Sequence, residues 1–134
     1  MKLNLDAIDE VYQRLNVPEV TGVITGRLTK NNRPFNSDKE DIVISDLALN
    51  NDQLQRGMLV VNIHVPNLVL AGPSGTDTTQ ANHARLKALS KIIVPLLKDY
   101  WGLDYNMDIE QINLLTEEKS SFQNIRVEYF AINV

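Results

Sequence analysis

Apolar residues recur at three- and four-residue spacing near the start of the chain, at Leu5, Ile8, Val11, Tyr12 and Leu15. This spacing places them on one face of a helix. Acidic residues in the early turns suit the positive end of a helix dipole. Because the residue before a proline disfavours the helical conformation, we expect this helix, over residues 5–15, to end before Pro18.

The pattern then changes to the two-residue alternation of β-strands. Residues Val20–Thr29 predict a first strand, Asp41–Leu49 a second and Gly57–Val65 a third. The third is apolar almost throughout, which predicts a central strand covered on both faces. The segment Lys30–Asp41 is rich in turn-forming residues and predicts a loop. Loops of this length are usually functional when they are ordered.

A long second helix is predicted over Thr78–Tyr100. It carries a broad apolar stripe that should face the sheet, made of Ala81, Leu86, Leu89, Ile92, Ile93, Leu96, Leu97 and Tyr100. Pro95 lies inside this helix and predicts a kink, and Gly102 is expected to close it. The preceding segment, Pro66–Asp77, is predicted to be a loop with an unusually apolar first half.

The rest of the chain predicts an antiparallel hairpin, with strands at Leu103–Leu115 and Ser121–Val134. No repeat or low-complexity tract divides the sequence, so residues 1–134 are predicted to form a single domain. The predicted fold class is therefore α+β, in the order α-β-β-β-α-β-β. It consists of a mostly antiparallel sheet with two helices packed on it.

Charge and composition narrow the classes of partner. The net charge is −4, and the thirteen Lys and Arg residues are scattered along the chain. Clustered cations are what hold phosphate backbones, so we expect no specific nucleic acid. The longest apolar run is far short of the ~20 residues that span a bilayer, and no signal-like segment is present. We expect a cytoplasmic protein without a membrane partner.

Metal and cofactor chemistry has little support in the sequence. There are no cysteines, and neither His64 nor His83 has a partner at the spacing that places two ligands on one helix face. Asp38, Glu40 and Asp41 could chelate calcium, but they lack the turn glycine of calcium loops, which favours a solvated loop. We therefore expect no metal and no cofactor.

Catalytic motifs are also incomplete. The stretch Gly72-Pro-Ser-Gly lacks the Lys of a phosphate-binding loop, and Asp77 would repel a phosphate. Ser74 lacks the sharp elbow that activates a nucleophile. Tyr100, Trp101 and Tyr105 are most simply core anchors at a helix end. The strand carboxylates are most simply a solvent face. They are Asp108, Glu110 and Glu128. No enzyme activity is expected.

The remaining candidate is a contact surface. Leu68, Val69 and Leu70 place apolar side chains in a predicted loop, which is typical of association sites. We hypothesise that they pack against a neighbouring copy. The alternative is that this segment folds back over the sheet or extends the third strand. Arg33 and Phe35, in the other long loop, are weaker interface candidates.

The element order, the length and these loops resemble the tail-completion or tail-terminator proteins of long-tailed phages. Residues 33–37 (Arg-Pro-Phe-Asn-Ser), 41–44 (Asp-Ile-Val-Ile) and 55–66 (Gln-Arg-Gly-Met-Leu-Val-Val-Asn-Ile-His-Val-Pro) also look like this group. The resemblance implies a structural subunit of a ring, commonly hexameric, that caps the tail tube and joins it to the head. It implies phage tail or neck proteins as partners and incorporation into the virion.

Ring closure of this kind uses head-to-tail contacts, which need two different patches on one subunit. A second class of function stays open, because one fold can serve many functions. In that class the chain is a small ligand-binding or accessory α+β domain without catalysis.

Overall fold

The computed structural model describes residues 1–132. Its helices are α1 (Asn4–Leu15), α2 (Pro18–Thr21) and α3 (His83–Leu97). Its strands are β1 (Leu28–Lys30), β2 (Asp41–Leu49), β3 (Leu54–Pro66), β4 (Leu70–Gly72), β5 (Gly75–Asp77), β6 (Tyr100–Trp101), β7 (Tyr105–Thr116) and β8 (Ser120–Ile132). The predicted α+β class is confirmed. The predicted order is wrong in detail, because it lacks α2, the β4–β5 pair and β6.

Six strands form the main sheet, in the order β1-β2-β3-β8-β7-β6. β1 and β2 are parallel, and every other pair of neighbours is antiparallel. The central strands β3 and β8 pair over their whole lengths, from Leu54 opposite Ile132 to Pro66 opposite Ser120. The mostly antiparallel sheet is thus confirmed, as is the central position of the third predicted strand.

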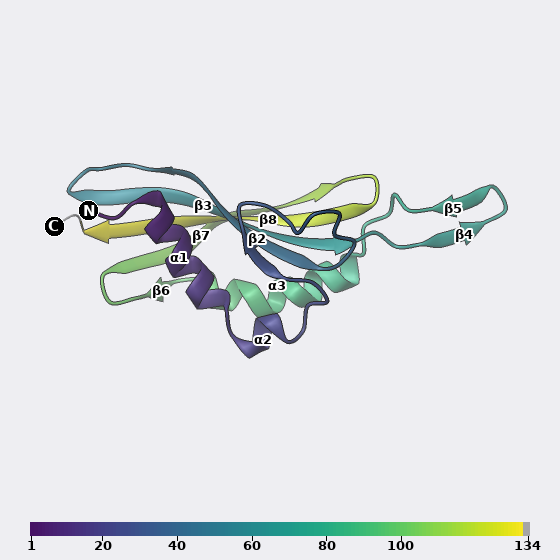
Figure 1. Ribbon diagram of the computed structural model, residues 1–134, viewed down its shortest axis with the longest axis horizontal. Coiled ribbons are helices and arrows are strands. Elements are labelled where there is room, and N and C mark those ends of the chain that lie inside the picture. Colours follow the sequence, from purple (N-terminus) through teal and green to yellow (C-terminus); the bar gives the residue numbers. More distant parts are fainter. Residues whose placement is uncertain (133–134) are drawn as a thin grey trace.

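Helices α1 and α3 pack on one face of this sheet (Figure 1). α3 buries the apolar stripe expected of it, through Leu86, Leu89, Ile93 and Leu97. These side chains meet the alternate inward-facing residues of the two central strands. That layer consists of Leu59, Val61, Ile63, Ile125, Val127 and Tyr129. The sequence pattern and the core therefore agree.

The predicted first strand at Val20–Thr29 is wrong over most of its length. Pro18 is instead the first residue of the short helix α2, a position where its missing N–H costs nothing. Val20 and Ile24 are buried without belonging to a strand, and only Leu28 and its two successors pair with β2. The alternation in the sequence arises because α2 buries Val20 and the coil after it buries Ile24.

Position 26, between α2 and β1, has room only for glycine. A Cβ atom on Gly26 would lie 2.1 Å from Oδ1 of Asp41 and 2.4 Å from the carbonyl oxygen of Glu40. The Gly26 N–H donates to that same carbonyl at 2.8 Å. This close approach holds the entry to β1 against the start of β2.

The second helix is shorter than predicted at both ends. It begins at His83, where the Asn82 side chain accepts a hydrogen bond from the Arg85 N–H and caps the helix. It ends at Leu97, so Pro95 lies in its last turn. The chain then reverses at Asp99, which has a positive φ of 49°, and enters β6.

The C-terminal hairpin is confirmed with shifted bounds, as β7 and β8. The last residues of its predicted second strand, Asn133 and Val134, lie outside the described residues. None of the helices in residues 1–132 is long and apolar enough to cross a bilayer.

Candidate functional site

Residues 68–80 form an arm that extends from the body along the long axis of the molecule (Figure 1). Its strands β4 and β5 pair with each other, with Leu70 opposite Asp77 and Gly72 opposite Gly75. Gly75 has a φ of 121°, which a glycine adopts without steric strain. The predicted apolar loop is therefore a hairpin, and it neither folds over the sheet nor extends β3.

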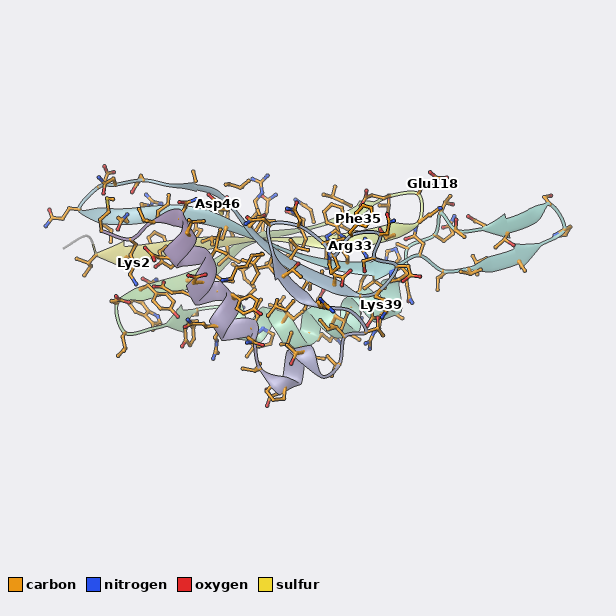
Figure 2. All side chains as sticks on the ribbon, viewed as in Figure 1. Lys2, Arg33, Phe35, Lys39, Asp46 and Glu118 are labelled. Carbon is orange, nitrogen blue, oxygen red and sulfur yellow. The ribbon has the colours of Figure 1, made fainter. Side chains whose placement is uncertain are left out.

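The arm is almost entirely exposed. Every residue from Leu68 to Thr76 is exposed, including 74% of Val69 and 45% of Leu70. The whole chain exposes 7880 Å², whereas a compact monomer of 15.1 kDa should expose roughly 7,100 Å². The exposed surface is thus larger than that of a compact monomer, as expected for a chain with a projecting arm. Its apolar side chains have no covering layer within the described part of the chain (Figure 2).

One buried side chain, Asn67, anchors the base of the arm. Its Nδ2 donates to the carbonyl oxygens of Thr78 at 2.8 Å, Glu117 at 2.9 Å and Glu118 at 3.3 Å. Its Oδ1 accepts a hydrogen bond from Oγ of Ser121 at 2.6 Å. Asn67 thereby ties both strands of the arm base to the β7–β8 turn, so the direction of the arm is set by the body.

The other interface candidates lie in the segment between β1 and β2, where Figure 2 shows Arg33, Phe35 and Lys39. Arg33 faces inward: its Nε donates to Oδ2 of Asp41 at 3.1 Å, and its Nη2 donates to the carbonyl of Lys39. Phe35, in contrast, is 94% exposed. The structure thus gives Arg33 the role of fixing its own loop and leaves Phe35 at the surface.

The acidic residues predicted to lie in a solvated loop rather than a calcium site are not all solvated, because Glu40 and Asp41 are buried and form ion pairs. Glu40 pairs with Arg85 at the start of α3, while Asp41 pairs with Arg33. Hydrogen bonds from Arg85 lower the pKa of the Glu40 carboxyl. These carboxylates hold the loop and α3 in place. Within residues 1–132, no three His, Cys, Asp or Glu side chains gather as a metal site would require.

The two histidines lie in unlike environments. His64 is buried in β3, with its ring centroid 4.8 Å from that of Phe122. Burial, assisted by the nearby charge of Arg33, lowers the pKa of His64 to about 4, so its imidazole is neutral at pH 7. His83 is the exposed first residue of α3.

Two further sequence interpretations are corrected. The Gly72-Pro-Ser-Gly stretch, including Ser74, forms the tip of the arm and not the approach to a helix. Trp101 is 71% exposed and so is not a core anchor, because α3 ends before it and places it in the short edge strand β6. Tyr105, by contrast, stacks on buried Tyr129 at a centroid separation of 5.6 Å.

Two open apolar hollows were not expected from the sequence. One, of about 400 Å³, lies between α3 and β7, and Leu86, Val94, Pro95 and Leu114 supply its apolar lining. The other, of about 560 Å³, lies around β6, and its lining includes Leu54, Trp101 and Leu103. Both bring together residues far apart in the chain, which no local pattern reveals.

Comparison with known proteins gives no family: no family model matches this chain, and no curated protein matches it.

Proposed function

We propose that this chain is a structural assembly protein whose arm, residues 68–80, binds a neighbouring copy. The observation that carries the proposal is the exposure, outside the body, of a two-stranded ribbon whose first half is apolar. A two-stranded hairpin by itself is at best marginally stable in water, and it becomes stable when a further strand or surface covers it. An arm of this kind is therefore most useful in contact with a partner.

The expected gain from such a contact is sizeable. Leu68, Val69 and Leu70 are 39%, 74% and 45% exposed. Full burial of one large aliphatic side chain from complete exposure is worth about 1.5–3 kcal/mol. Together with backbone pairing along the ribbon, partial burial of the three offsets much of the free energy lost when two subunits associate.

We further propose that the assembly is a closed ring, such as the one that caps the tail tube of long-tailed phages and joins it to the head. This part rests on the resemblance of the element order and loops to tail-terminator proteins. It also rests on the form of the arm, which projects from one end of the subunit, whereas residues 1–132 form no similar arm at the opposite end (Figure 1). Its natural receiver is a different surface on the next subunit. Under this proposal the subunit acts through protein contacts and catalyses no reaction. Other phage tail or neck proteins are its further partners.

The test is the mass of the protein in solution, by sedimentation from micromolar concentration upward. The wild type should be larger than the 15.1 kDa subunit. Replacing Val69 and Leu70 together by Asp places a charge on each face of the ribbon and should leave a folded monomer. The matched control replaces Val23 and Leu47, which are also exposed and lie outside the arm, by Asp. This control should assemble like the wild type.

A monomeric wild type would overturn the proposed function, as would an arm variant that assembles normally. Electron microscopy of the wild-type oligomer tests the ring itself. Closed rings of uniform diameter are expected, whereas open filaments would contradict ring closure.

A second candidate, binding of a small ligand, is favoured by the hollow at β6. It combines the exposed ring of Trp101 with Leu54 and Leu103. Trp101 is the one tryptophan in the sequence, so its fluorescence reports directly on this hollow. An amphiphilic dye such as anilinonaphthalene sulfonate should quench or shift that emission if the hollow binds ligands. Unchanged emission at millimolar dye would exclude this candidate.

A further inference from the structure

The outer edge of β7 has no strand beside it over most of its length. β6 pairs with β7 only at Met107 and Asn106, so the edge from Asp108 to Thr116 is unpaired among the described residues. Residues 111–116, Gln-Ile-Asn-Leu-Leu-Thr, contain no charge. Proteins usually protect free edges with charged residues, proline or a covering segment, because unpaired N–H and C=O groups bind other strands. The β7 edge has the features of a strand that receives a partner.

An apolar groove lies along this edge. Leu114 pairs with Gln123, whose side chain reaches Ser90 of α3, so Leu114 faces the helix side of the sheet. There it lines the hollow between β7 and α3, while 37% of its surface remains exposed. Lys87 and Lys91 of α3 also line the groove, and neither forms an ion pair within residues 1–132.

We propose that the arm of one copy adds to the free β7 edge of the next copy, with Leu68 and Leu70 entering the groove between β7 and α3. This inference rests on the proposed function and names the surface that receives the arm. Addition of an extended ribbon to a sheet edge uses backbone hydrogen bonds for affinity and alternate side chains for specificity. Leu70 begins β4 and Leu68 lies two residues before it, so the two side chains would share a face once the ribbon extends along the edge.

The arm and the groove carry charges of opposite sign. Asp77 is the one charged residue of the arm, and it lies directly opposite Leu70, so the two side chains share a face of the ribbon. With Leu70 in the groove, Asp77 is carried toward Lys87 and Lys91. Hydrogen bonds from Thr79 at 2.6 and 2.8 Å lower the pKa of Asp77, which is therefore ionised at neutral pH.

The arm cannot make this contact within its own subunit while its base is intact. The hydrogen bonds of Asn67 hold the two chain segments at the base of the arm against the β7–β8 turn. From there the arm extends away from the body and away from its own β7 edge (Figure 1). A neighbouring copy is consequently the receiver, and each subunit provides one arm and one edge.

Complementary variants test this arrangement. The arm variant, with Val69 and Leu70 both replaced by Asp, keeps an intact edge. A groove variant, Leu114→Asp, keeps an intact arm. Each alone should remain at 15.1 kDa, because it lacks one half of every contact. Mixed in equal amounts, the two should form a dimer of twice that mass and nothing larger, since one intact contact remains per pair.

The outcomes separate this inference from the proposed function. If the wild type assembles but the groove variant assembles equally well, the receiving surface is wrong while self-association stands. A mixture that stays monomeric overturns the inference in the same way. If the wild type itself is a monomer, both proposals fall. Circular dichroism of each variant, compared with the wild type, verifies that the subunits are folded.

Cysteine cross-linking provides a second readout that does not depend on disrupting the contact. The chain has no cysteine of its own. Leu70→Cys mixed with Leu114→Cys should give a disulfide-linked dimer of unlike chains on mild oxidation. Leu70→Cys mixed with Leu47→Cys, on the exposed part of β2, is the control and should not. Equal yields in both mixtures would contradict the proposed contact.

Discussion

The hydroxyl of Ser121 donates a hydrogen bond to Oδ1 of Asn67 at 2.6 Å, and both side chains are buried. This contact joins the start of β8 to the base of the arm, across 54 positions of sequence. Nδ2 of the Asn67 side chain donates to three backbone carbonyls, so replacing Asn67 by a residue without an amide leaves several buried polar groups without partners.

We predict that Asn67→Ala lowers the free energy of unfolding by about 1–3 kcal/mol, the usual cost of unsatisfied buried polar groups. It should also weaken self-association, because the direction of the arm is lost. Urea unfolding and sedimentation measure the two effects. The variant Ser121→Ala and the double variant complete a mutant cycle, and strictly additive losses would mean that the two side chains do not interact.

The arm should be a site of cleavage in the monomer and not in the assembly. Thermolysin cuts before large apolar residues, and Leu68, Val69 and Leu70 are exposed on the arm. At dilution we expect a first cut within residues 68–70. At concentrations where the oligomer forms, that cut should be strongly slowed. A first cut elsewhere, or a rate unaffected by concentration, would contradict an arm that is covered on assembly.

The apolar face of α3 should dominate the stability of the subunit. Leu89 and Ile93 are 0% and 1% exposed. Replacing either by Ala removes buried carbon and leaves a cavity, so we expect a loss of about 2–5 kcal/mol in the free energy of unfolding. The control is Leu103→Ala at a fully exposed leucine, where the change should stay within about 0.5 kcal/mol. Chemical denaturation of the three variants provides the comparison.

His64 should make the protein acid-labile. Its pKa is about 4 in the folded chain, beside Arg33 and Asp41, against 6.5 ordinarily. Above pH 6.5 the imidazole is neutral in both states and has no effect. As the pH falls from 6.5 toward 4 the unfolded chain gains the proton first, so stability decreases. Each pH unit between the two pKa values corresponds to about 1.4 kcal/mol.

The corresponding measurement is the urea midpoint at pH 7 and at pH 5. His64→Phe should flatten the difference between the two, while His83→Phe at the exposed histidine should leave it unchanged. An equal response of both variants would show that burial of His64 is not the cause.

Elements that repeat a pattern over several turns or residue pairs are predictable from the sequence of this chain. The helix expected over residues 5–15 lies at Asn4–Leu15, and β2 lies at the predicted Asp41–Leu49. Short elements are not. Pro18 reads equally well as the end of one helix and as the first residue of another, and in the structure it begins α2.

The arm shows why the candidate site is only partly predictable. Leu68, Val69 and Leu70 stand out in the sequence as an apolar run, and the structure exposes them, while their role in association stays a prediction. Strands of three residues are too short to show an alternation, and the turn signals at Gly72 and Gly75 suit a loop as well as a hairpin. The direction of the arm depends on contacts of Asn67 with residues 117–121, which no local pattern contains.

Because the arm adds nothing to the buried core, substitutions beyond its base are neutral for folding. Single substitutions on the arm can therefore change which neighbour a subunit binds, and the core needs no compensating substitution. Preference for self over a related subunit can diverge rapidly in such a protein, while the sheet and its two covering helices stay the same.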